Sequence, residues 1–175
     1  MTLEGYIAGS KGEMDWMLLD WDDALKKYVT AITTSVDCII LGRKLAQGFI
    51  PHWAAKPEQE GADKMNNTAK VVFTKTLDKS EWPNTGLAKG NLVDEITQLK
   101  KQPVNDIIVY SGANFVSALI KEGLNDEYHL FINPTSIGNG IKKIKEPNNK
   151  LNLALVKSTS FACGLNVHNF EQKSN

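Results

Sequence analysis

The stretch Asp37-Cys38-Ile39-Ile40-Leu41-Gly42-Arg43-Lys44 decides the expected fold of this chain. Its four consecutive apolar residues are too few for a core helix, and β-branched side chains favour an extended strand. A continuous apolar run is typical of a strand that is buried on both faces of a sheet. We therefore expect a sheet that is covered by helices.

The residues after this strand have the chemistry of an anion site. Gly42 permits a sharp turn, and the segment from Arg43 to Phe49 predicts a short helix whose first N–H groups lack partners. Such N–H groups attract anions, and Arg43 and Lys44 add two positive charges that suit a phosphate monoester. The turn indicates a site for NADPH, and a solvated turn without a ligand is the alternative.

Composition limits the functions to consider. A chain of 175 residues and 19.4 kDa suits one domain over residues 1–175. Its 20 basic and 20 acidic side chains balance, which is unlike a nucleic-acid binder. No apolar run approaches the roughly 18 residues of a membrane span, and the first residues lack a signal pattern, so we expect a cytoplasmic protein without a membrane partner.

The two cysteines do not indicate a metal centre or a disulfide scaffold. Cys38 lies within the predicted strand and Cys163 lies near the C-terminus, without the spacing of metal ligands. We expect no metal and two inert thiols.

The first part of the chain is rich in glycine and tryptophan. Glycines predict a mobile loop from Met1 to Gly12. The following pairs Asp15-Trp16 and Asp20-Trp21 place two indoles beside carboxylates. These could line a pocket for a flat heterocycle, or a single aromatic could pin a surface loop.

Hydrophobic periodicity and helix or strand boundary signals predict the other elements. Residues 50–68 read as a long loop with a short helix near Glu58–Met65. We expect helices from Asp22 or Asp23 to about Thr34, over Asn91–Lys101, and from Ala113 to Gly123. We expect strands over Lys70–Thr74, Asp106–Tyr110 and Tyr128–Ile132, and an antiparallel hairpin formed by Leu151–Phe161 and Leu165–Phe170.

Two further strand ends repeat the anion-binding chemistry. Thr74-Lys75-Thr76 offers hydroxyls and a cation, and the amides from Gly112 to Phe115 could hold a pyrophosphate at a helix start. A tight turn without a ligand is the alternative for the second site. Gly138-Asn139-Gly140 lacks the surrounding strand and helix of a dinucleotide-binding motif, so we do not expect it to bind a dinucleotide.

Six segments occur in the order and at the spacing of a known family, and the match spans nearly the whole chain. The chain resembles the dihydrofolate reductase-like superfamily, in particular the reductase domain of the bifunctional riboflavin-biosynthesis deaminase-reductase. The resemblance implies a three-layer α/β fold, in which a central mixed, mostly parallel sheet is flanked by helices and followed by a C-terminal antiparallel hairpin. The segments are Leu3–Ala8, Leu41–Lys44, Thr74–Leu77, Val109–Gly112, Leu124–Glu127, and Pro134 with Gly138–Gly140.

The resemblance also implies NADPH as cofactor, a small-molecule substrate and often a homodimer. It assigns the adenosine 2′-phosphate to the turn of Gly42, Arg43 and Lys44 together with Thr74 and Lys75. It assigns the pyrophosphate to the turn formed by Ser111, Gly112, Ala113 and Asn114. It places Ile7 and Ala8 near the nicotinamide.

The candidate proton donors are carboxyl groups near the expected nicotinamide loop. Glu4 and Asp15 are the first candidates, and Asp22 or Asp23 at the head of the first helix is a weaker third. We expect the three histidines, His52, His129 and His168, to be structural.

We therefore expect an NADPH-dependent reductase that transfers a hydride to a small heterocyclic or imine-type substrate, as in the reduction of 5-amino-6-(5-phosphoribosylamino)uracil. The alternative is a non-catalytic, dimeric NADP(H)-binding scaffold with a degenerate active site. Dihydrofolate reduction is less expected, because the Leu25–Ile32 face offers no acid for a pteridine pocket.

Three departures from the family pattern bear on the expected activity. Glu4 stands where the family has Asp, Ser111 stands where two glycines are commoner, and the apolar first strand of the family is absent before Leu3. Either the start is truncated or another segment fills the place of that central strand.

Overall fold

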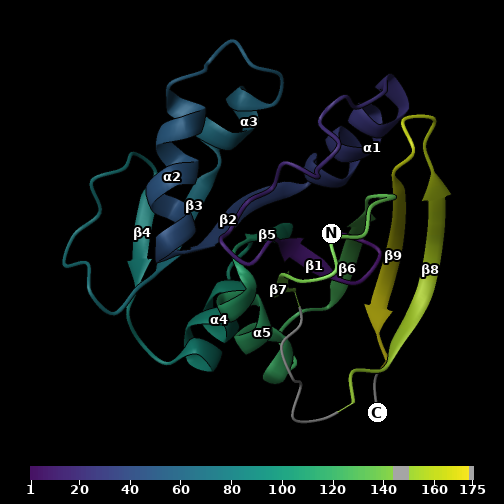
Figure 1. The fold of residues 1–175 in the computed structure, drawn as a ribbon. Coiled ribbons are helices and arrows are strands. Elements are labelled where there is room, and N and C mark those ends of the chain that lie inside the picture. Colours follow the sequence, from purple (N-terminus) through teal and green to yellow (C-terminus); the bar gives the residue numbers. More distant parts are fainter. Residues whose placement is uncertain (144–149, 174–175) are drawn as a thin grey trace. The chain divides into compact units, whose positions relative to one another are not determined.

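The computed structural model describes residues 1–143 and 150–173 and contains two compact units (Figure 1). The first unit comprises Met1–Tyr28 and Ala113–Asn175, and the second comprises Val29–Gly112. Helix α1 (Asp23–Thr33) begins in the first unit and ends in the second. That residues 1–175 form one domain stays a prediction.

The second unit contains a four-stranded parallel sheet in the order β4-β3-β2-β5. The central strand β2 pairs on both sides, with Ile40 opposite Val71 of β3 and Val109 of β5. Because all three pairings are parallel, the carboxyl ends of the strands meet at one edge. The strands are β2 (Val36–Gly42), β3 (Ala69–Phe73), β4 (Thr85–Ala88) and β5 (Asp106–Tyr110).

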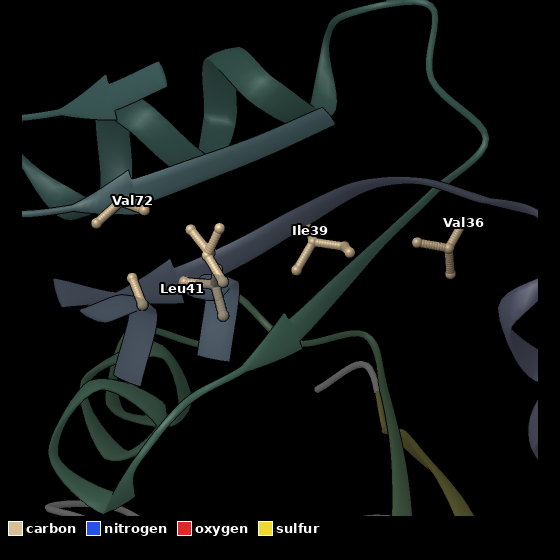
Figure 2. Packing of buried hydrophobic residues seen from close by; sticks show 6 residues of the cluster. Val36, Ile39, Leu41 and Val72 are labelled. Atoms are coloured by element: carbon tan, nitrogen blue, oxygen red, sulfur yellow. The ribbon is translucent and has the colours of Figure 1, made fainter. Parts of the chain in front are cut away.

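Strand β2 is buried as its apolar sequence predicts. Ile39 and Leu41 are 1% and 0% exposed and pack in one cluster with Val36 and with Val72 of β3, as Figure 2 shows. Burying each such side chain contributes about 1.5–3 kcal/mol, so this cluster is a main source of stability for the second unit.

Three helices accompany this sheet: α2 (Arg43–Ala54), α3 (Ala62–Asn67) and α4 (Leu92–Lys100). The expected short helix from Arg43 continues through Pro51 to Ala54, so the predicted loop begins later. Burial of Ile50 in the core holds this last part of α2 in place. Strand β4 was not predicted, because its four residues include a glycine and carry no clear alternation.

The first unit contains a three-stranded antiparallel sheet in the order β6-β9-β8. Its strands are β6 (Glu127–Ile132), β8 (Leu153–Ser160) and β9 (Asn166–Gln172), which confirms the predicted C-terminal hairpin. Strand β8 is the edge strand, where Leu155 and Val156 are exposed and the register is irregular between Leu155 and Lys157.

The expected mobile loop at residues 1–12 is wrong for part of its length. Strand β1 (Tyr6–Ala8) pairs with β7 (Ile141–Lys142). The Leu3 N–H also donates to the carbonyl of Thr135 at 3.0 Å. Three residues between glycines are too few to show a strand pattern in the sequence, so pairing with a distant partner decided the structure.

The fold is mixed α/β, with a parallel sheet flanked by helices and a C-terminal antiparallel sheet, as predicted. Helix α5 (Ala113–Lys121) follows β5 directly and buries Val116, Leu119 and Ile120. Within the described ranges, no helix is both long and apolar enough to span a membrane.

Candidate functional site

The carboxyl ends of the four parallel strands form a shared edge, which we call the carboxyl edge. Gly42 of β2 lies opposite Phe73 of β3, and Phe73 lies opposite Ala88 of β4. The neighbouring residue Leu41 lies opposite Tyr110 of β5. The residues that follow these ends are therefore brought together, and they include the predicted cofactor residues Arg43, Lys44, Thr74, Lys75, Ser111 and Gly112.

The turn between β2 and α2 presents open amides beside two cations. Gly42 is the N-cap of α2, and no side chain in residues 1–143 or 150–173 caps it by a hydrogen bond. The Arg43 Nη1 lies 3.4 Å from the Gln47 Oε1, and Lys44 is exposed. A helix start with uncapped N–H groups and two positive charges fits an anionic group.

The loop after β3 is held by the side chains of Thr74 and Lys75. The buried Thr74 Oγ1 accepts hydrogen bonds from the N–H groups of Thr76 and Leu77, both at 3.1 Å. The Lys75 ammonium donates to the carbonyl oxygens of Lys89 and Gly90 at 2.6 and 2.7 Å. Lys75 therefore joins the loops after β3 and β4 while its charge remains at the carboxyl edge.

The turn after β5 is divided between the two units. Ser111 and Gly112 end the second unit, and Ala113 and Asn114 begin α5 in the first. Among the described residues, no atom lies within 4 Å of the position that a Gly112 Cβ would take. The backbone at Gly112 is therefore open to a close approach.

Glu4 lies in the first unit and binds a loop of the chain itself. Its carboxylate accepts hydrogen bonds from the N–H groups of Ile137, at 2.8 Å, and Gly138, at 3.1 Å. The Ile137 bond, a bond from the Ser136 side chain and the Gly138 bond hold the pKa of Glu4 below its usual range. Glu4 is therefore ionised at neutral pH, which argues against its expected role as proton donor.

The other predicted residues of the first unit lie on β1 and in the segment after it. Ile7 and Ala8 belong to β1, and Asp15 is exposed. A Cβ at Gly140 would clash with the carbonyl oxygen of Ala8. Close packing against β1 therefore explains the glycine at position 140.

Asp22 is the cap of α1, as predicted from its position. Its Oδ1 accepts from the N–H of Leu25 at 2.8 Å, and its Oδ2 accepts from the N–H of Cys163 at 2.9 Å. These bonds lower the pKa of Asp22. Asp22 therefore joins α1 to the turn between β8 and β9 as a carboxylate.

The sequence analysis missed a second group of polar side chains in the first unit. The Tyr28 hydroxyl lies 2.8 Å from the His129 Nδ1, and the His129 Nε2 lies 3.0 Å from the Glu127 Oε1. Tyr28 and His129 are 101 residues apart, so only the fold reveals their contact.

Residues 1–167 match the model of the RibD C-terminal domain family. The chain is 32% identical to the uncharacterized protein YyaP of Bacillus subtilis over 174 residues, which cover 94% of this chain and 87% of YyaP. It is 24% identical to the riboflavin biosynthesis protein RibD of Corynebacterium ammoniagenes, over 83% of this chain and 44% of that protein.

Solved structures share the fold at lower identity. A diaminohydroxyphosphoribosylaminopyrimidine deaminase/5-amino-6-(5-phosphoribosylamino)uracil reductase from Thermotoga maritima matches with a TM-score of 0.70 and 16% identity, over 98% of this chain and 54% of that one. A dihydrofolate reductase from Enterococcus faecalis, complexed with NADP(H), matches with a TM-score of 0.63 and 12% identity, over 99% of this chain and 93% of that one.

The chain thus spans about half the length of the deaminase/reductase from Thermotoga and of the Corynebacterium RibD. Its match to the family model, in contrast, covers all but its last residues. The chain belongs to the RibD C-terminal domain family.

Proposed function

We propose that this protein is an NADPH-dependent reductase that transfers a hydride to a small heterocyclic or imine-type substrate of the pyrimidine or pteridine class. The observation that carries the proposal is the carboxyl edge, where the uncapped start of α2 lies beside Arg43 and Lys44. In α/β sheets, ligands bind at such edges, and paired cations suit a phosphorylated ribose. Membership of a reductase-like family supports the same activity.

Each predicted binding residue has a defined task in this proposal. Gly42, Arg43 and Lys44, with Thr74 and Lys75, would hold the 2′-phosphate. Ser111, Gly112, Ala113 and Asn114 would hold the pyrophosphate, and the open space at Gly112 fits this task. Ile7 and Ala8 would lie near the nicotinamide, which supplies the hydride when the cofactor is bound.

The substrate to test first is 5-amino-6-(5-phosphoribosylamino)uracil. The reductase from Thermotoga maritima carries this compound in its name and shares the fold. The proposal includes a homodimer, which light scattering after gel filtration would detect.

A non-catalytic NADP(H)-binding scaffold is the second candidate. It is favoured by the state of Glu4, whose carboxylate is ionised and engaged by backbone N–H groups. Such a protein would keep the carboxyl edge and bind the cofactor, but it would not oxidise it.

The decisive experiment titrates the protein with NADPH and, separately, with NADH, and follows the fluorescence of its four tryptophans. We expect NADPH to bind at least about tenfold more tightly, a difference of about 1.4 kcal/mol. Absorbance of the reduced nicotinamide then reports turnover with 5-amino-6-(5-phosphoribosylamino)uracil and with a panel of pteridines and small carbonyl compounds. Failure to bind either nucleotide contradicts both candidates, whereas tight binding without turnover supports the scaffold.

A further inference from the structure

Tyr28, His129 and Glu127 form a hydrogen-bonded chain of three titratable side chains in the first unit. The Tyr28 hydroxyl lies 2.8 Å from the His129 Nδ1. The His129 Nε2 lies 3.0 Å from the Glu127 Oε1, which also accepts a 2.8 Å hydrogen bond from the Asn169 side chain. We call these three residues the Tyr28 relay.

The chemistry of the partners fixes where the protons lie. An ionised carboxylate can only accept hydrogen bonds, so the His129 Nε2 must carry a proton toward Glu127. When His129 is neutral, its Nδ1 is then the acceptor for the Tyr28 hydroxyl. When His129 is protonated, its Nδ1 donates to the Tyr28 oxygen and frees the hydroxyl proton for another acceptor.

The surroundings of the relay suit the supply of protons from solvent. The Tyr28 ring has edge-on contacts with Phe131 and Phe161, at centroid distances of 6.2 and 5.7 Å. Burial, followed by the charge of Glu127, raises the pKa of Tyr28, so its phenol keeps its proton at neutral pH. The side chains of His129 and Glu127 are 23% and 50% exposed, so exposure increases along the relay toward water.

We infer that Tyr28 is the proton donor of the reduction and that His129 returns a proton to it from solvent, with Glu127 and Asn169 as positioning residues. This inference rests on the proposed reductase function. Hydride transfer to a C=N or C=O bond requires a proton at the nitrogen or oxygen, and the ionised Glu4 has none to give.

The atoms and electrons of the step balance with the reduced nicotinamide as the only reductant. The hydride forms a bond to the substrate carbon, and the π electrons move to the nitrogen or oxygen. That atom takes the hydroxyl proton of Tyr28, and the resulting phenolate takes the proton from the His129 Nδ1. His129 is left neutral with its Nε2 proton toward Glu127, and water reprotonates it before the next turnover.

This mechanism predicts activity that decreases as the pH rises and His129 loses its second proton. The groups that face His129 come from three elements. Tyr28 comes from α1, Asn169 lies opposite His129 on β9, and Lys157 of β8 lies opposite Asn169. Glu171 of β9 lies opposite Glu127. The carboxylate that contacts the ring directly belongs to Glu127, so its removal should change the pH profile most.

The test compares Tyr28→Phe with wild type, using NADPH and 5-amino-6-(5-phosphoribosylamino)uracil as probes. We expect kcat to decrease about 10²- to 10⁴-fold, the usual contribution of a general acid, while NADPH binding by tryptophan fluorescence is unchanged. Tyr128→Phe is the matched control: Tyr128 is buried on β6, and in the described part of the chain its hydroxyl has no hydrogen-bond partner. This control should keep the wild-type kcat.

The pH dependence of kcat separates proton relay from a merely structural role. Glu127→Gln should move the decrease in kcat to lower pH, because the imidazolium loses its carboxylate partner. His129→Gln should remove this pH dependence and lower kcat. Because Glu127 is half exposed, this pair of measurements remains available if Tyr28→Phe does not fold.

Two outcomes overturn the inference while leaving the proposed reductase in place. One is a wild-type enzyme that turns over and a folded Tyr28→Phe variant with the same kcat. The other is a Glu127→Gln variant whose pH profile matches that of wild type. A wild-type protein that binds NADPH and reduces no member of the panel contradicts the reductase itself, and the inference with it.

Discussion

The carboxyl edge and the Glu4 loop use the same chemistry with opposite results. At the carboxyl edge, the first amides of α2 lie beside Arg43 and Lys44, and no side chain of the described residues caps this helix. In the Glu4 loop, the amides of Ile137 and Gly138 already hold the Glu4 carboxylate. The chain thus provides its own anion in one region and leaves the other open to an external one.

This difference shows why a residue type alone does not assign a role. A carboxylate near an expected active-site loop suggests a proton donor, but two backbone N–H groups stabilise its charged form. Cations after a strand suggest a solvated turn, but their place beside uncapped amides creates a binding surface. What decides between these roles is whether the polar group finds a partner within the chain.

Removal of core packing beneath the carboxyl edge should have the largest effect on the molecule. Leu41 is 0% exposed and precedes the Gly42 turn on β2. Leu41→Ala should lower the free energy of unfolding by about 2–5 kcal/mol, because the cavity cannot fully collapse. Urea denaturation measures this loss. Leu155→Ala, at a position that is 57% exposed, is the control and should change it by about 0.5 kcal/mol or less. Equal losses would show that the carboxyl edge does not depend on β2 packing.

Loss of one cation should sharpen the assignment of the open region. Arg43→Gln should weaken NADPH binding about tenfold or more and leave NADH binding nearly unchanged, because only NADPH carries the additional phosphate. Tryptophan fluorescence measures both constants. Lys101→Gln is the control, since Lys101 ends α4 before β5 begins and lies at the other end of the strand. An equal loss for both nucleotides would place Arg43 at a group that they share.

The smallest expected effect concerns the region that is already satisfied. The folded-state pKa of Glu4 lies below its ordinary value, so its stabilising effect is present above that ordinary value and is lost as the pH falls through the folded pKa. Wild type should therefore melt at a higher temperature than Glu4→Gln near neutral pH, and the difference should shrink below about pH 4. Thermal denaturation across this range measures it, with Glu81→Gln, at an exposed site, as the control. A difference in melting temperature that does not vary with pH would show that the carboxylate charge is not responsible.

The sequence predicted the elements whose signals are local. The apolar run Cys38–Leu41 identified β2, and the residues after the strands identified the carboxyl edge, because parallel strands bring their ends together. Strands β1 and β4 were missed because they are short and are formed through pairing with other segments. The same reason applies to the candidate sites: Glu4 meets Ile137 across 133 positions, and Tyr28 meets His129 across 101.

The two glycines of the Glu4 loop set different limits on how this sequence can evolve. Gly138 has a φ of +70° with open space around it, so asparagine, which tolerates that conformation, could replace it during divergence. Gly140 is confined by the backbone of β1, where any side chain would strike the Ala8 carbonyl oxygen. Drift in this family can therefore pass through position 138, whereas a change at position 140 would require β1 and this loop to separate together.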